Sequence, residues 1–166
     1  MKILLRVILL AALLFAGWWL WNFLFPSAEK IVRKKMTLLA TTASFGEKTN
    51  PITRAAKANK VVEMFAPDAQ IVVNIRGHGS VNITGRDEIS ERALAAFGGF
   101  SALHVEFLDL NVRVGADRQF AEVNCTAKVS LGDNKDYSVQ EMQFSFIKSD
   151  DGNWRIVKVE TVETLS

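Results

Sequence analysis

The longest apolar stretch of the chain lies at its start, from Ile3 to Phe25, and only Arg6 and Asn22 interrupt it. About 20 apolar residues cross the hydrocarbon core of a bilayer as a helix, so this run is long enough. Arg6 is close enough to one end to reach the headgroups. Tryptophans cluster at the other end, where the membrane–water boundary favours them. The pattern predicts a transmembrane anchor over residues 1–26, followed by one domain over residues 27–166.

A cleaved signal peptide is the competing interpretation of the same run. A signal peptide has an apolar core of about 7–15 residues and small residues at its cleavage site. Here the core is longer, and the bulky stretch from Trp18 to Phe25 occupies the place of the small residues. Pro26 also stands just before Ala28, the candidate cleavage position. We therefore expect a retained anchor, while cleavage in a fraction of the molecules stays open.

Two helical stripes of apolar residues follow the anchor. The first covers residues 28–45, and Gly46 ends it. The second covers residues 51–65, with Asn50 as its N-cap and a proline at its first position. Pro67 is expected to close this second helix. The pattern thus predicts two helices joined by a short loop.

Beyond Pro67 the pattern becomes that of β-strands, with one further helix between them. The stretch GRDEISERALAAFGG, residues 85–99, predicts this helix because acids occupy its first turn and glycines follow its last. Strands are expected at residues 70–76, 81–84, 104–114, 119–131, 137–148 and 154–163. Helices followed by a long antiparallel meander predict an α+β domain whose helices pack on one face of the sheet.

The order of these segments and their local sequences resemble those of the nuclear transport factor 2-like (NTF2-like) superfamily, which includes SnoaL-like domains. VVEMFAPDAQIVV is similar to the end of that family's second helix and its first strand. TGRDEISERALAAF is similar to its third helix, and DGNWRIVKVE to its last hairpin. The resemblance covers residues 28–166. It implies a cystatin-like cone, in which three helices pack on a curved, mostly antiparallel sheet, often around a cavity. Members include enzymes and interaction subunits, so the fold does not decide the function.

One branch of that family, the steroid isomerases, implies a chemistry that this sequence lacks. The branch uses a carboxylate base near the end of the first long strand, together with a tyrosine and a second acid. Here Val73, Asn74 and Ile75 occupy the region of the base, and the only tyrosine, Tyr137, lies on a late strand. We do not expect this chemistry.

The net charge of +2 conceals two regions of opposite sign. Residues 28–60 hold eight Lys/Arg against two Glu, whereas residues 61–166 hold ten Lys/Arg against sixteen Asp/Glu. Cations beside an anionic lipid surface gain about 1 kcal/mol each. We expect the basic segment 30–35 to lie against membrane lipid, as residues 3–25 do; a solvated helix face explains it equally well. The acidic remainder argues against nucleic acid as a partner.

The side of the membrane on which the domain lies is open to two interpretations. The cations of segment 30–35 follow the span, and the positive-inside rule then favours a cytoplasmic domain. A very short basic start before a long apolar run is, however, how secretory signal-anchors begin. We expect the exported side, periplasmic or extracellular, with the cytoplasmic side as the alternative.

Histidines supply the few candidate catalytic groups. His78 stands between two glycines and could act as an acid–base group, although an ordinary turn position is the commoner explanation. His104 begins a strand; it could face the interior of the cone beside Asn74, or simply cap the strand. We take Asn74, His104 and Trp154 as candidate ligand-binding residues, while Trp154 is most simply a core or rim residue.

Metal and disulfide chemistry find no support in the sequence. The two histidines and the single cysteine are far apart and show no metal-ligand spacing, and no cofactor is expected. Cys125 cannot form an intramolecular disulfide and belongs to an apolar row, which predicts an inert buried thiol.

Two functions from different classes remain. The first is a membrane-anchored module that binds a small apolar ligand or a protein, without defined catalysis, and forms homodimers through the open sheet face, as family members do. The alternative is a small isomerase, dehydratase or cyclase that acts on a lipophilic substrate with His104 or His78 as the base. A closed apolar interior favours the module, and a cavity where a histidine and a carboxylate converge favours the enzyme.

Overall fold

The computed structural model describes residues 27–75, 79–132 and 137–162. The predicted anchor over residues 1–26 and the candidate His78 lie outside these ranges. Among the helices that are described, none is long and apolar enough to cross a membrane. The elements are α2 (Ala28–Ala43), α3 (Pro51–Val62), β1 (Phe65–Ile75), β2 (Gly79–Thr84), α4 (Arg86–Gly99), β3 (Leu103–Val114), β4 (Phe120–Leu131), β5 (Tyr137–Lys148) and β6 (Trp154–Thr161).

The strands form a six-stranded sheet in the order β2-β1-β6-β5-β4-β3. All neighbouring strands are antiparallel except β1 and β6, which run parallel. The predicted mostly antiparallel sheet is therefore confirmed. Strand β3 stands at one end of the sheet, so that one of its edges has no neighbouring strand.

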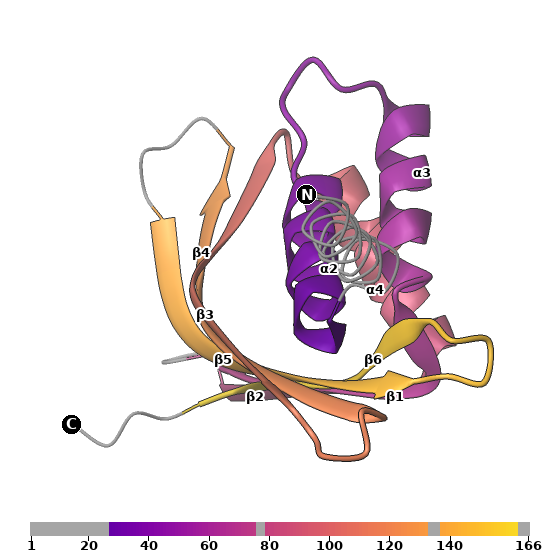
Figure 1. Cartoon of the computed structure of the whole chain (residues 1–166). Helices are drawn as coiled ribbons and strands as arrows, with labels where there is room; N and C mark the ends of the chain where they lie inside the picture. Colours follow the sequence, from indigo (N-terminus) through magenta and orange to yellow (C-terminus); the bar gives the residue numbers. More distant parts are fainter. Residues whose placement is uncertain (1–26, 76–78, 133–136, 163–166) are drawn as a thin grey trace, which may run out of the picture.

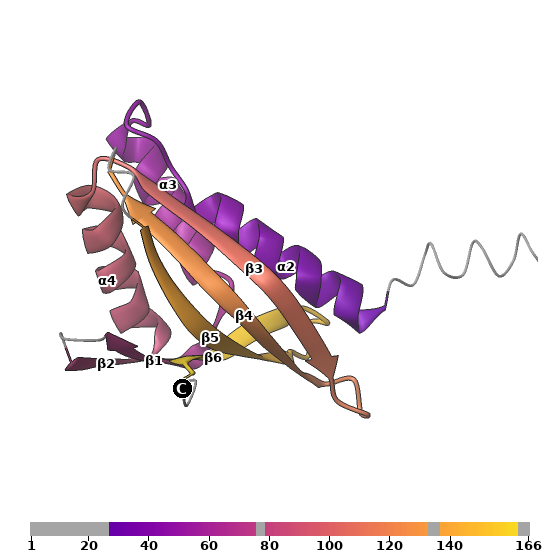
Figure 2. The same cartoon turned by 90° about the vertical axis from the view of Figure 1, so that its left-hand side faces the viewer.

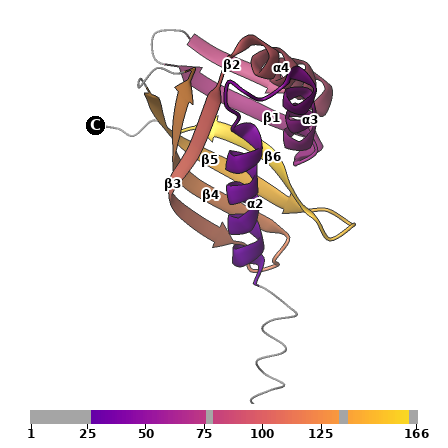
Figure 3. The same ribbon diagram turned by 90° about the horizontal axis from the view of Figure 1, so that it is seen from above.

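The sheet is curved, and the helices lie on its concave side (Figure 1). Helix α2 runs beside β3, whereas α3 and α4 lie together near the opposite part of the sheet (Figures 2 and 3). The contacts agree with this picture, because α2 packs mainly against β3 and α3 packs mainly against α4. The α+β cone expected from the family resemblance is the observed fold.

The core lies between the helices and the inward row of each strand. On β4 every second residue from Ala121 to Ala127 is buried, which agrees with the apolar row expected around Cys125. The largest core side chains are almost completely buried. The buried residues of the sheet include Ala121, Val123, Cys125, Phe144, Phe146, Trp154 and Ile156, which pack against Val32, Met36 and Leu39 of α2. The concave interior is thus filled by apolar side chains.

Helix α2 begins where the sequence predicts and ends slightly earlier than residue 45. Its first turn is capped by the Ser27 hydroxyl, which accepts the Lys30 N–H at 3.4 Å. Ser44 already has an extended backbone, and Phe45 forms an isolated bridge with Leu103 at the start of β3. The bridge to β3 therefore decides where α2 ends, rather than Gly46.

Helix α3 confirms its predicted start and contradicts its predicted end. The side chain of Asn50 accepts the Thr53 N–H at 2.7 Å, as expected of an N-cap. The helix ends at Val62, however, and residues 65–67 already belong to β1. Phe65 is the register partner of Ile156 in β6. This strand pairing prevails over the helical apolar stripe that runs to Phe65, so Pro67 lies in a strand and does not close the helix.

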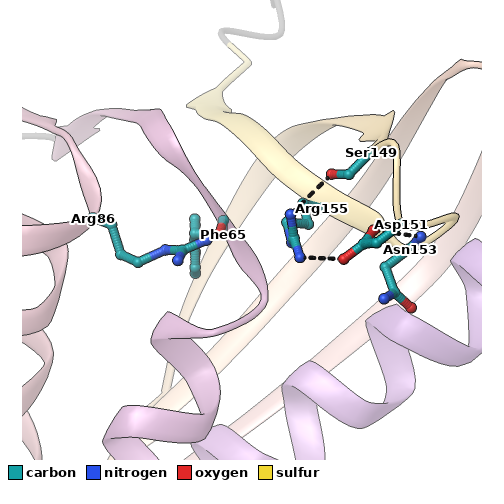
Figure 4. Close-up of polar contacts among 6 residues, drawn as sticks. All are labelled: Phe65, Arg86, Ser149, Asp151, Asn153 and Arg155. Carbon is teal, nitrogen blue, oxygen red and sulfur yellow. Dashed lines mark hydrogen bonds and ion pairs between the residues drawn. The ribbon is translucent and has the colours of Figure 1, made fainter.

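Helix α4 lies where the stretch GRDEISERALAAFGG predicts it. Gly85 precedes it with a φ of 87°, a conformation that glycine adopts without steric cost. Arg86, the first helical residue, reaches back to the start of β1 and donates to the carbonyl of Phe65 (Figure 4). This contact holds the start of α4 against β1, which begins where the sequence predicts the last turn of α3.

Candidate functional site

A cavity of about 420 Å³ lies between helix α2 and the edge strand β3, and we call it the α2–β3 cavity. The two elements run side by side in all the views (Figures 1 to 3). The lining residues are Met36, Thr37, Ala40, Thr41 and Ser44 from α2, and His104, Val105, Glu106, Phe107 and Leu110 from β3. The α2 wall combines apolar and hydroxyl side chains, which is a common composition for small-molecule sites.

Strand β3 presents its edge to this cavity. Four consecutive residues, from His104 to Phe107, line it. Successive side chains of a strand point to opposite faces, so the four side chains cannot share one side. Val105 and Phe107 are half-buried and point inward, whereas His104 and Glu106 are exposed on the outer face. The backbone between them therefore forms part of the cavity wall.

The backbone groups along this edge are only partly paired. Leu103 exchanges two hydrogen bonds with Phe45, at 2.7 and 2.9 Å. Two residues further on, the Ser44 hydroxyl takes the place of a neighbouring strand and accepts the Val105 N–H at 2.9 Å. Strand geometry aims the N–H and C=O of Phe107 in the same direction. Within the described ranges, neither of these two groups of Phe107 has a hydrogen-bond partner beyond the sheet edge.

Beyond Phe107 the edge of β3 is closed by a different arrangement. The pairing with β4 shifts between Leu108 and Asn111, where Asp109 has a φ of 53°. This bulge redirects the strand. Arg33 of α2 then donates from Nη1 to the carbonyl of Leu110 at 3.1 Å. Paired groups thus flank Phe107 on both sides, and its own donor and acceptor face the cavity.

The hydroxyls on the α2 wall are available to a ligand mainly as hydrogen-bond acceptors. Each donates its proton to a carbonyl of the preceding turn, which leaves lone pairs on its oxygen. The bonds run from Thr37 to Arg33 at 3.2 Å, from Thr41 to Thr37 at 3.1 Å and from Ser44 to Ala40 at 2.7 Å. A ligand in this cavity therefore meets a donor and an acceptor on β3 and acceptors on α2, between apolar side chains.

The sheet does not bring the candidate ligand-binding residues together. Asn74 is exposed on β1 and His104 is exposed on β3, and three strands separate β1 from β3 in the sheet. The Asn74 N–H donates to the Thr161 hydroxyl at 3.0 Å. Trp154 is only 2% exposed and packs in the core. Of these residues, His104 lines the α2–β3 cavity, at its rim.

Cys125 is buried in the apolar row of β4, as the sequence predicts, and is 4% exposed. Burial raises the pKa of its thiol to about 12, with a smaller contribution from the charge of Glu141. A thiol with such a pKa is not a nucleophile at neutral pH. Within the described ranges, no group of three or more His, Cys, Asp or Glu side chains is placed to hold a metal ion.

Among the residues that line the α2–β3 cavity, the sequence singles out only His104 as a candidate site residue. Thr37, Thr41 and Ser44 recur on one side of α2, directly beside the apolar stripe. A solvated helix face usually carries charged residues beside its apolar stripe. The three hydroxyl residues at helical spacing are therefore the feature of the sequence that could indicate the cavity. The unpaired backbone of Phe107 leaves no trace in the sequence.

Comparison with known proteins identifies the family. The model of the SnoaL-like domain matches residues 54–160, from α3 to β6. The chain belongs to the SnoaL-like domain family. Among curated protein sequences, none matches it.

Solved structures share the fold of this SnoaL-like protein. An NTF2-like protein with a cystatin-like fold from Novosphingobium aromaticivorans is 16% identical, with a TM-score of 0.61 over 80% of this chain and 79% of its own. An NTF2-like protein from Pseudomonas putida is 12% identical, with a TM-score of 0.64 over 84% and 88%. A ketosteroid isomerase-like protein from Erwinia carotovora atroseptica is 16% identical, with a TM-score of 0.55 over 84% and 100%. At these identities the likeness establishes the fold alone.

Proposed function

We propose that this SnoaL-like protein is a membrane-tethered module that binds a small apolar molecule in the α2–β3 cavity without transforming it. One observation carries the proposal: the concave interior is filled by core side chains, and the α2–β3 cavity lies at the sheet edge beside the unpaired backbone of Phe107. A ligand that fits is apolar over most of its surface. It carries one group that both accepts and donates hydrogen bonds, as an amide or a carboxylic acid does.

The positions of the titratable groups support binding without catalysis. His104 and Glu106 are the titratable residues that line the cavity. Both are exposed, and both alternate with inward-pointing residues of β3. Glu106 also lies 4.0 Å from the Lys128 ammonium on the outer face. General acid–base catalysis requires a group within hydrogen-bond reach of the reacting atoms, and this pair stands at the rim instead.

The membrane tether is part of the same proposal. Residues 3–25 have the length and composition of a bilayer span, and α2 begins directly after them. Lys30 and Lys34 of segment 30–35 are exposed and free to contact lipid headgroups. We place the domain on the exported side. Because α2 follows the span directly and lines the cavity, an apolar molecule would have only a short distance to pass from the lipid to the cavity.

A homodimer through the outer face of the sheet also belongs to the proposal. The residues of this face include five exposed apolar side chains, Leu108, Phe120, Tyr137, Val139 and Ile147. The described helices lie on the opposite, concave side of the sheet (Figure 1). Replacing Val139, which is 51% exposed, by lysine should convert dimers to monomers in analytical ultracentrifugation, if this face pairs.

An isomerase, dehydratase or cyclase with His104 as base is the second candidate. The observation that favours it is that His104 and Glu106 lie on the same face of β3 and line the same cavity. If the protein is such an enzyme, His104→Ala abolishes conversion of the ligand while the ligand still binds. If the ligand is recovered unchanged from both the wild type and His104→Ala, the enzyme is excluded and the binding module is supported.

Native mass spectrometry of the detergent-purified full chain tests the main proposal. We expect a retained molecule of a few hundred daltons. Ala40→Phe fills the cavity from its α2 wall and should release that molecule. Ala56→Phe, the same change at an exposed position of α3 that does not line the cavity, should retain it. A chain without bound ligand in every preparation would contradict the proposal.

A further inference from the structure

A second cavity, of about 460 Å³, lies on the other flank of α2, and we call it the α2–α3 cavity. Its walls come from α2, from the end of α3 and the two residues Glu63 and Met64 after it, from Asn153 in the β5–β6 turn and from Arg155 of β6. At 3.6 residues per turn, its α2 residues Lys35, Leu38 and Thr42 lie roughly opposite Ala40 and Ser44, which line the first cavity. The two cavities are therefore separate sites.

Three cationic residues from three different elements line the α2–α3 cavity. Lys35 comes from α2, Lys60 from the last turn of α3, and Arg155 from β6. One acid, Glu63, lines the cavity with them. Within the described residues, neither lysine lies within ion-pair distance of an acid, nor does Glu63 lie within that distance of a base. Two lysines without partners at one cavity raise its positive potential, which favours an anion there.

The Arg155 side chain is held in place by contacts with Ser149 and Asp151 (Figure 4). Its Nη2 lies 2.5 Å from a carboxylate oxygen of Asp151, and its Nη1 donates to the Ser149 hydroxyl at 3.2 Å. Asp151 is held in turn by the Asn153 N–H at 2.9 Å. That hydrogen bond and the Arg155 charge lower the pKa of Asp151, so the pair stays ionised. Even with Asp151 and Glu63 counted, the cations remain in excess.

We propose that the α2–α3 cavity binds an anionic head group, a phosphate or a carboxylate, carried on an apolar chain. Lys35 and Lys60 supply the charge, and Arg155 supplies oriented N–H donors. Leu38, which is 50% exposed, and Met64 line the same cavity and give the chain an apolar surface. The source is either a lipid of the adjoining bilayer or a free amphiphile.

Titration of the full chain in phosphatidylcholine nanodiscs tests this inference, with hexyl phosphate as the probe and calorimetry as the readout. The variant Lys35→Gln/Lys60→Gln should bind at least tenfold more weakly than the wild type. The matched control, Lys48→Gln/Lys148→Gln, removes the same charge from exposed lysines that do not line the cavity, and should change affinity less than twofold. Equal weakening in both variants, or no saturable binding to the wild type, would overturn the proposal.

Two further arms complete the test. With phosphatidylglycerol in the nanodisc, competition for hexyl phosphate that requires Lys35 and Lys60 identifies a lipid headgroup as the occupant; unchanged affinity identifies a free amphiphile. If circular dichroism shows that the double variant is unfolded, Arg155→Lys replaces it and should also weaken hexyl phosphate binding. This variant keeps the charge but loses the guanidinium that bonds to both Asp151 and Ser149. Ala40→Phe, which fills the other cavity, should leave hexyl phosphate binding unchanged.

Discussion

The guanidinium carbon of Arg54 lies 4.9 Å from the centroid of the Phe45 ring, and the same guanidinium donates to backbone carbonyls on two separate loops. Its partners are Thr49 at 2.9 Å and Glu47 at 3.2 Å before α3, and Phe100 at 2.7 Å and Ser101 at 2.9 Å after α4. Phe45 is the residue that bridges to Leu103. One arginine of α3 thus ties the end of α2 to the start of β3, beside the α2–β3 cavity.

Replacing Arg54 by alanine should destabilise the domain by about 3 kcal/mol, because several charge-assisted hydrogen bonds and a cation–π contact disappear together. The control is Arg92→Ala. Arg92 is 65% exposed and pairs with Glu88 at 3.6 Å, so its loss should cost less than about 0.5 kcal/mol. Urea unfolding followed by circular dichroism measures both. Similar midpoints for the two variants would contradict the role given to Arg54.

The sequence predicts the sheet better than the cavities, for a physical reason. Apolar and polar residues alternate along residues 120–131 because one face of the strand is buried, and the hydrophobicity of each residue type indicates which face that is. The end of α3 is mispredicted because Phe65 suits a helical stripe as well as a strand, and only pairing with Ile156 decides between them. The α2–β3 cavity depends on Ser44 meeting Val105, which is distant in the chain. No local pattern contains that contact.

Ser44 itself provides the second prediction. In Ser44→Ala the Val105 N–H loses its acceptor, so the edge of β3 should open locally. We expect the Val105 amide to exchange with deuterium at least tenfold faster, and the domain to lose about 1 kcal/mol of stability. Ser138→Ala, at an exposed position of β5, is the control. Unchanged exchange at Val105 would mean that the hydroxyl does not substitute for a strand.

Trp154 separates a core role from a ligand role. As a residue that is 2% exposed, it should cost about 3–5 kcal/mol on replacement by alanine, because a large cavity remains. Trp154→Phe keeps most of the apolar volume and should keep both the fold and the ligand that we expect in native mass spectrometry. Loss of the ligand in Trp154→Phe at nearly unchanged stability would instead restore Trp154 as a ligand-binding residue.

The buried thiol of Cys125 makes stability depend on pH in the alkaline range. Burial raises its pKa from 9.0 to about 12, so the folded domain disfavours the thiolate that the unfolded chain forms readily. This contribution to stability is therefore complete below pH 9 and is lost as the pH rises toward 12. Cys125→Ala lacks the group and should lose less stability over that range, as urea unfolding at each pH measures.

At pH 8 a thiol reagent should label Cys125 only as fast as the domain unfolds, and rapid labelling of the folded wild type would show that the thiol is accessible.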